Sequence, residues 1–145
     1  MSGSESEWIG LRLLAISNRY LQPVHAEIEE RYGLTRDDVA VIVHLAVSGT
    51  ATAQEIVRST GRPKNSMSRS VVSLERRGII RRRPHPVDGR AAVLQLTATG
   101  RKLRGVLAEA FGDADERLLR ALDDNERAAF IRGLIKIGDE AARDR

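Results

Sequence analysis

Basic side chains that can bind a polyanion gather in one stretch of this chain. Between Arg62 and Arg104 there are twelve Lys or Arg residues and only two acids, Glu75 and Asp88. The rest of the chain has twelve basic and eighteen acidic residues, so the overall charge of +4 hides a strong segregation. A basic helix followed by a basic hairpin is the charge pattern of a module that binds duplex nucleic acid. The alternative is a charged, hydrated surface, which does not require such segregation.

The strongest candidate for reading DNA is a helix predicted at about residues 63–77. At 100° per residue, Met67, Val71 and Leu74 form a narrow apolar stripe that should be buried. The opposite side is polar and basic. Arg can bond guanine bidentately, Asn can bond adenine, and a helix N-terminus attracts phosphate. Arg76 is ambiguous, because a cation near a helix C-terminus also complements the helix dipole. The candidate DNA-binding residues of this segment are Arg62, Lys64, Asn65, Ser66, Ser68 and Arg69.

A hairpin wing is predicted at about residues 79–97, with strands at 79–86 and 91–97. Asp88-Gly89 between the strands is a strong hairpin-turn dipeptide. Three consecutive arginines alternate in direction along the first strand, so at least one should reach phosphate, with Arg82 and Arg83 as the candidates.

The wing tip offers a second kind of DNA contact. Arg90 follows the turn, and an Arg at the tip of a stiff hairpin can enter a narrow A·T minor groove. Asp88 lies two residues away and can orient the Arg90 guanidinium by a charge-assisted hydrogen bond. The alternative for Asp88 is a simple turn residue.

The elements before this module read as helices. A helix is predicted from Trp8 to about Arg31, with Pro23 either kinking it or dividing it, and with Gly33 as its stop. Thr35 should start a second helix, and the capping box Thr52-x-x-Glu55 a third. The residues expected on the buried face of the second helix are Val39, Ile42, Val43 and Ala46.

The predicted fold class is mainly α with a small β-hairpin wing (α+β): a winged helix-turn-helix with N- and C-terminal dimerisation helices. Thr97 should cap a long helix, and a further helix should start near Asp123. The terminal helices have more apolar residues than a three-helix core needs, and interlocking them between two subunits would cover this surface; the alternative is a monomer with these helices folded back. The expected divisions are residues 1–33 for a tail and dimerisation helix, 34–99 for the DNA-binding domain, and 100–145 for dimerisation helices.

Composition excludes several functions. No apolar run is long enough to span a membrane, and the acidic, polar start is not a secretory signal, so a cytoplasmic protein is expected. There is no cysteine, which excludes disulfides and thiol sensing, and the three histidines lack metal-ligand spacing. Without a Gly-rich phosphate loop or a nucleophile with its base, we expect no enzyme, no cofactor and no metal.

Several motifs together resemble the MarR family of bacterial transcriptional regulators over nearly the whole length. The most specific is Asp88-x-Arg90 followed by Leu94-x-Leu96-Thr97-x-x-Gly100, which matches that family's wing signature. Ser68-Arg69, Leu34-Thr35 and the segment from Leu74 to Ile80 are also similar. Lys64-Asn65 departs from the small hydroxylated residues common in the family. The resemblance implies a homodimer that reads a pseudo-palindromic operator, with the helix from Pro63 in the major groove and Asp88 and Arg90 as the wing-tip pair.

The resemblance also implies a ligand. Many relatives bind a small anionic or phenolic molecule between the dimer helices and the DNA-binding lobe, and then release DNA. Such an effector must bind the DNA-incompetent state more tightly. The expected function is therefore a sequence-specific regulator, in most cases a repressor, and the alternative is a non-specific architectural DNA-binding protein. The candidate effector-binding residues are Trp8, Arg12, Tyr20, His25 and His44.

Overall fold

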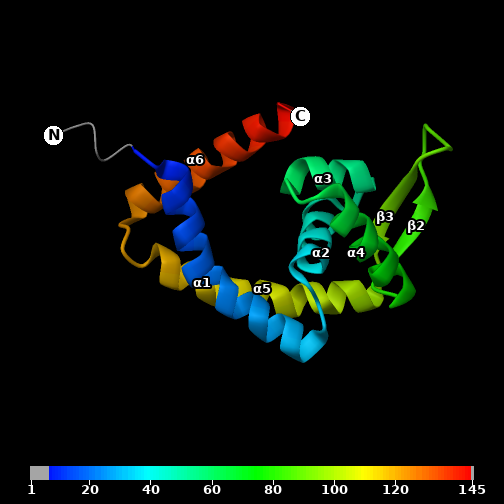
Figure 1. Cartoon of the computed structure of the whole chain (residues 1–145), viewed down its shortest axis with the longest axis horizontal. Helices are drawn as coiled ribbons and strands as arrows, with labels where there is room; N and C mark the ends of the chain where they lie inside the picture. Colours follow the sequence, from blue (N-terminus) through cyan, green and yellow to red (C-terminus); the bar gives the residue numbers. More distant parts are fainter. Residues whose placement is uncertain (1–6, 145) are drawn as a thin grey trace.

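The computed structural model describes residues 7–144, which form six helices and three short strands (Figure 1). This confirms the predicted fold class of a mainly helical protein with a small antiparallel sheet. In chain order the elements are α1 (Ile9–Tyr32), α2 (Arg36–Ser48), β1 (Thr50–Ala51), α3 (Ala53–Thr60), α4 (Lys64–Arg76), β2 (Ile80–Pro84), β3 (Ala92–Leu96), α5 (Ala98–Leu119) and α6 (Asp124–Arg143).

The helix boundaries follow the capping signals in the sequence. The side chains of Thr35, Thr52 and Asp123 each accept a hydrogen bond from the backbone N–H three residues on, in complete capping boxes. Gly33 ends α1 in the left-handed conformation that glycine adopts without strain. Pro23 lies inside α1 without dividing it, so of the two alternatives the interrupted helix is wrong.

The sheet has the strand order β1-β3-β2, and all pairs are antiparallel. Strand β1 was not predicted, because two residues, Thr50 and Ala51, carry no detectable periodicity. Pairing between β2 and β3 stops at Pro84 and Ala92, so the wing tip is a seven-residue loop, residues 85–91. The strands are therefore shorter than the expected 79–86 and 91–97. The chain does turn at Asp88-Gly89, where the Asp88 carbonyl accepts the Ala91 N–H, but Gly89 does not have the positive φ that a type I′ turn requires.

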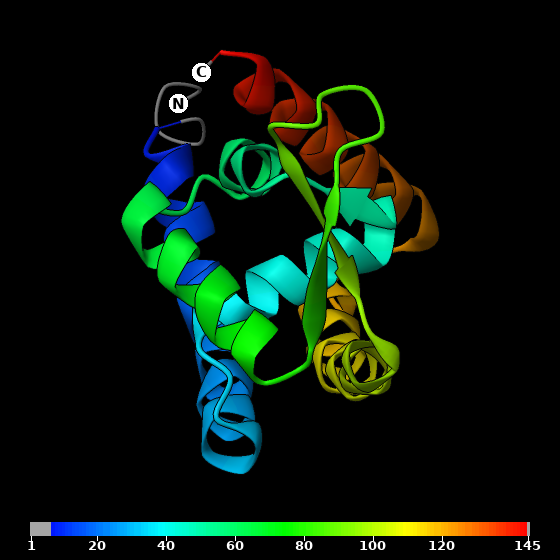
Figure 2. The same ribbon diagram turned by 90° about the vertical axis from the view of Figure 1, so that its right-hand side faces the viewer.

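Helix α5 joins the two ends of the molecule. In Figure 1 it runs along the base, with α1 and α6 at one end and the lobe of α2, α3, α4 and the sheet at the other. Figure 2 looks onto that lobe, with α4 on the left and the hairpin of β2 and β3 to its right. Large apolar side chains from α2, α3, α4 and the sheet fill the core of the lobe. The largest fully buried ones there are Ile42, Leu45, Ile56, Met67, Leu74, Ile80 and Leu94.

Helix α2 is buried on more than one side, since it packs against α4, α5 and β3. Val39 and Ile42 are buried as expected, but Val43 is 43% exposed and lines a cavity. Val41 and Leu45 take up core positions instead. The single-face pattern expected for this helix was therefore wrong at Val43, because a helix packed on several sides has no single apolar stripe.

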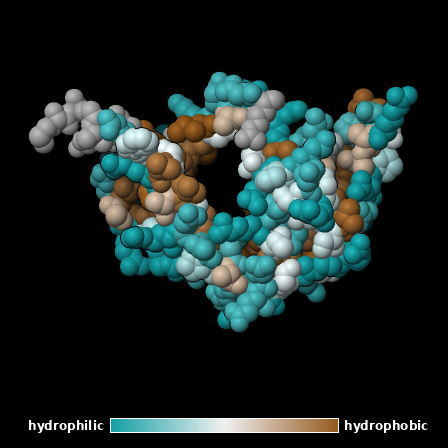
Figure 3. Space-filling model, viewed as in Figure 1, coloured by the Kyte–Doolittle hydropathy of each residue, from teal (hydrophilic) through white to brown (hydrophobic). Residues whose placement is uncertain are grey.

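The terminal helices leave apolar side chains on the surface. Figure 3 shows hydrophobic (brown) surface gathered over α1 and α6. No residue of α6 is buried, although the helix has a clear apolar face. Within residues 7–144, no helix is both long and apolar enough to cross a membrane. The large exposed apolar residues of these two helices are Ile9, Leu11, Leu13, Leu14, Ile16, Ile131, Leu134, Ile135 and Ile137.

Candidate nucleic-acid interface and adjoining cavity

Helix α4 has the two faces that its sequence predicts. Met67, Val71 and Leu74 are buried, and Ser70 is buried beside them. This anchoring fixes the rotation of the helix about its axis, so the opposite face is presented to solvent. The exposed residues of that face are Lys64, Asn65, Ser68, Arg69, Val72 and Arg76.

Arg62 differs from the other candidates, because its guanidinium forms an ion pair within the protein. The Nε of Arg62 donates to the carboxylate of Asp37, in the first turn of α2. Burial alone would raise the pKa of Asp37, but hydrogen bonds from Arg62 and Ser66 and the charges of Arg62 and Arg69 lower it overall. The pair joins the start of α4 to the start of α2, so Arg62 fixes the position of α4.

The first turns of α4 place further polar groups near a groove. The Ser68 hydroxyl donates to the Lys64 carbonyl, which leaves its oxygen free to accept from solvent or a ligand. Lys64 and Ser68 line a shallow groove between α3 and α4 together with Gln54 and Arg58. Sequence reasoning missed Arg58 and Gln54, because only the packing of α3 against α4 brings them to this side.

The three arginines of β2 have different surroundings. Arg81 donates two hydrogen bonds to the side chain of Gln95 on β3. The Arg82 guanidinium is 3.3 Å from the Glu75 carboxylate at the end of α4, an exposed pair that phosphate can displace at little cost. Arg83 is exposed and makes no ion pair with any residue of the described range 7–144. Arg82 and Arg83 therefore remain candidates for phosphate contact.

Asp88 does not orient the Arg90 guanidinium, contrary to the sequence-based expectation. Its Oδ1 instead accepts the backbone N–H of Arg90 at 3.0 Å, and its carbonyl accepts the N–H of Ala91. An Asp side chain that bonds the backbone two residues on is a turn-forming group. The alternative role of Asp88 as a turn residue is the one that the structure supports, and the Arg90 side chain is exposed at the tip.

The end of the wing motif, Leu96-Thr97-x-x-Gly100, has a steric explanation. Thr97 Oγ1 donates to the carbonyl of Gly78 or Ile79 and accepts the N–H of Gly100. A Cβ at Gly100 would lie 2.2 Å from the Ile79 carbonyl oxygen, so only glycine fits where α5 meets the wing. Arg77 makes a second link, donating to the carbonyls of Tyr32 and Gly33 at the end of α1.

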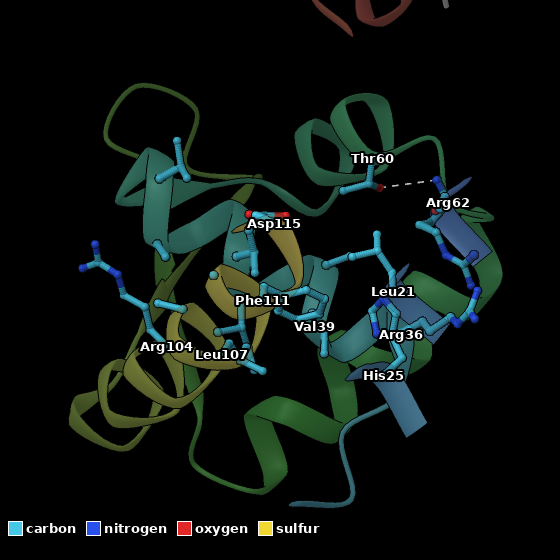
Figure 4. A pocket seen from close by; sticks show the side chains of 18 residues that line it. Leu21, His25, Arg36, Val39, Thr60, Arg62, Arg104, Leu107, Phe111 and Asp115 are labelled. Carbon is cyan, nitrogen blue, oxygen red and sulfur yellow. Dashed lines mark hydrogen bonds between the residues drawn. The ribbon is translucent and has the colours of Figure 1, made fainter. Parts of the chain in front are cut away.

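A cavity of about 710 Å³ lies between α1, α2 and α5, close to the α3–α4 turn (Figure 4). Its apolar walls include Leu21, Val39, Leu107 and Phe111. The His25 ring meets Phe111 edge-on, with the ring centroids 5.2 Å apart. The volume suits a small aromatic molecule.

Positive groups cluster at one end of the cavity. Arg36 and Arg62 lie near His25, and Arg104 lies at the opposite end (Figure 4). Burial lowers the pKa of His25, and the charges of Arg36 and Arg62 lower it further, so the ring is neutral near pH 7. Its Nδ1 is buried and has no hydrogen-bond partner among residues 7–144.

The structure does not bring the five predicted effector residues together. His25 lines the cavity, but Arg12 and Tyr20 line a separate hollow on α1. Trp8 is largely exposed before α1, and His44 lies outside the cavity lining. These four residues therefore do not line this cavity in the single chain, and their role in effector binding stays a prediction. Sequence reasoning missed Arg36, Arg104 and Phe111, which only the packing of helices brings together.

A basic helix anchored in a helix-turn-helix, a hairpin wing, and flanking helices define the winged helix-turn-helix class of transcriptional regulators. Residues 32–91 match the sequence profile of the MarR family, in agreement with the resemblance found in the sequence. The family consists of transcriptional regulators and not of enzymes.

The relatives agree with this assignment. The HTH-type transcriptional regulator BilQ of Clostridium symbiosum is 25% identical over 109 residues, covering 75% of this chain and 76% of that protein. A MarR-family regulator from Listeria monocytogenes, solved with a 26-mer DNA, is similar with a TM-score of 0.82 at 17% identity, over 94% of this chain and 90% of that one. Bordetella bronchiseptica BpsR, solved in a study of how 6-hydroxynicotinic acid regulates its DNA binding, has a TM-score of 0.74 at 22% identity, over 93% and 96%. At these identities the structural likeness establishes the fold.

Proposed function

We propose that this protein is a dimeric, sequence-specific DNA-binding transcriptional regulator that acts in the cytoplasm as a repressor and is released by a small anionic aromatic effector. The observation that carries the proposal is the exposed face of α4, where Asn65 and Arg69 lie opposite the buried stripe of Met67, Val71 and Leu74. A rigidly anchored helix with base-reading groups on its free face suits the major groove. The solved Listeria monocytogenes relative is a DNA complex, which supports the same assignment.

The other candidate DNA-binding residues would have three different roles. Lys64, Ser66, Ser68, Arg82 and Arg83 would bind phosphates, which positions the module without reading sequence. Arg90, exposed at the wing tip, would enter the adjacent minor groove. Arg62 and Asp88 would support these contacts through their bonds to Asp37 and to the Arg90 backbone.

A homodimer would cover the apolar surface of the terminal helices. At the start of α1, the residues Ile9, Leu11, Leu13, Leu14 and Ile16 lie on nearly all sides of the helix, and each is at least 37% exposed. A helix that is apolar all round belongs in a core. A second copy brings a matching surface and places two recognition helices on a two-fold axis, which suits a pseudo-palindromic operator.

The cavity would hold the effector. Arg36 and Arg62 offer charge to a carboxylate or phenolate, while Leu21, Val39 and Phe111 offer apolar walls to a ring. An acid drawn to Arg62 competes with Asp37 for the same guanidinium and so loosens the joint between α2 and α4. Such a ligand would bind the DNA-incompetent arrangement better, which is what release requires.

Fluorescence anisotropy on the DNA upstream of its own gene, against a scrambled duplex at two salt concentrations, tests the proposal. We expect a preference for the native site that survives the higher salt. Equal binding to both duplexes that disappears at the higher salt would instead favour a non-specific architectural protein. A selection from a genomic DNA library that enriches no sequence would establish that alternative.

A further inference from the structure

The wing tip is a closed loop and not an open hairpin end. Five hydrogen bonds hold residues 85–91: His85 N–H to Ala91 O, Ala91 N–H to Asp88 O, Arg90 N–H to Asp88 Oδ1, and the N–H groups of Val87 and Asp88 to the imidazole Nδ1 of His85. In this loop only the Gly89 N–H is without such a partner, since Pro86 has none to donate. The backbone that presents Arg90 is therefore fixed before any DNA arrives.

One side chain supplies two of these five bonds. The Nδ1 of His85 accepts from Val87 at 3.1 Å and from Asp88 at 3.0 Å, so the ring closes the loop from inside. The two prolines on either side of His85 fix their own φ angles, which holds the backbone of the loop in place. Asp88 receives a bond on its N–H and in turn bonds the N–H of Arg90, so the ring acts on Arg90 through one intervening residue.

We propose that His85 is the positioning residue of the wing: its neutral imidazole, as a double acceptor at Nδ1, holds the tip in the conformation that presents Arg90. This rests on the proposed DNA-binding function. A residue held ready in its binding geometry contributes affinity because less conformational freedom is lost on binding. The ring must carry its proton on Nε2, since a protonated Nδ1 cannot accept.

Charged groups of the wing and of α3 lie around the His85 ring. The charged group facing it from another element is Glu55, at the start of α3. A hydrogen bond from the Thr52 backbone and, to a smaller extent, the charges of His85 and His44 lower the pKa of Glu55. Within the wing the charged neighbours are Arg83, Asp88 and Arg90.

The matched pair of variants is His85→Ala and His85→Asn. An Asn side chain places a carbonyl oxygen close to where Nδ1 lies, so it can still accept, and it does not titrate. We expect His85→Ala to weaken operator binding about threefold to tenfold at pH 7.5 and His85→Asn to restore most of it. In an Arg90→Ala background His85→Ala should have no further effect.

A measurement on the free protein separates this proposal from the proposed function. Amide exchange at pH 7.5 should be slow at Val87 and Asp88 in the wild type and in His85→Asn, and fast in His85→Ala. Fast exchange in the wild type would show that the two hydrogen bonds to His85 Nδ1 do not hold the loop, whether or not the protein binds DNA. If His85→Ala reduces operator affinity equally in the wild-type and the Arg90→Ala backgrounds, His85 does not position Arg90. If exchange is slow but the protein shows no specific DNA binding, the proposed function alone is overturned.

Discussion

The α-carbon of Gly100 lies against the carbonyl of Ile79, so close that an added Cβ would be 2.2 Å from the carbonyl oxygen. This contact joins the first turn of α5 to the start of the wing, beside the hydrogen bond from Thr97 N–H to the same carbonyl. The wing and helix α5 therefore meet through backbone atoms, which cannot move aside as a flexible side chain would.

Gly100→Ala should destabilise the protein by about 1–3 kcal/mol, because the wing backbone must shift to admit the methyl group. Urea unfolding measures this. Gly105→Ala on the same helix is the matched control, since a Cβ there meets nothing within 4 Å. It should be neutral or stabilise by up to about 1 kcal/mol, because alanine is the better helix former. Similar effects of both substitutions would contradict the packing explanation.

Arg69→Ala should weaken operator binding by about 1–3 kcal/mol and relax the preference for one base in each half-site. The reason is the exposed place of Arg69 on α4 opposite the buried stripe. Binding selection on a randomised operator measures both effects. Arg120→Ala, an exposed arginine at the far end of α5, is the control for loss of charge. An equal loss on specific and random DNA would assign Arg69 to phosphate contact alone.

Leu14→Glu should make the protein monomeric at micromolar concentration, because a charge placed at the contact of the proposed dimer costs on the order of 3 kcal/mol or more. Leu14 is 55% exposed in the single chain. Val87→Glu makes the same change at a wing residue that is 91% exposed, and it should remain dimeric. Sedimentation equilibrium distinguishes the two. A dimeric Leu14→Glu variant would remove the terminal helices from the proposed interface.

The stability of the protein should fall as the pH decreases below about 6.5, partly because of His25. Burial and then the charges of Arg36 and Arg62 lower its pKa below the value of 6.5 for a free side chain. The unfolded chain therefore takes up a proton at a pH where the folded protein resists it, which favours unfolding. His25→Gln should reduce the slope of unfolding free energy between pH 6.5 and 5.5, by at most about 1.4 kcal/mol per pH unit.

His44 provides an internal comparison for that experiment. Burial lowers its pKa also, and Glu55 partly opposes the shift. His44→Gln should flatten the same slope, and the double variant should flatten it most. An unchanged slope in His25→Gln would mean that the pKa of His25 is the same in the folded and the unfolded protein.

The local signals in the sequence determined most of the fold. Thr35, Thr52, Thr97 and Asp123 each begin a helix where capping chemistry places it, and the apolar stripe of α4 predicts its buried face. These features depend on neighbours three or four residues away, which a sequence displays directly.

Features that depend on distant residues were not predictable in the same way. The cavity brings Arg36 of α2 together with Arg104 and Phe111 of α5, and the pair of Arg62 with Asp37 spans 25 positions. Val43 faces that cavity because α2 packs on several sides. The loop at the wing tip is longer than expected, and no turn rule anticipates that the Nδ1 of His85 accepts two backbone N–H groups there.

The length of α5 sets a spacing. Its 22 residues, at 1.5 Å each, make a rod of about 33 Å between the terminal helices and the wing, close to one turn of B-DNA. Inserting a single residue in this rod would rotate one end against the other by about 100°. In the proposed dimer, the number of residues in α5 would therefore set how far apart, and at what angle, the two α4 helices meet a duplex.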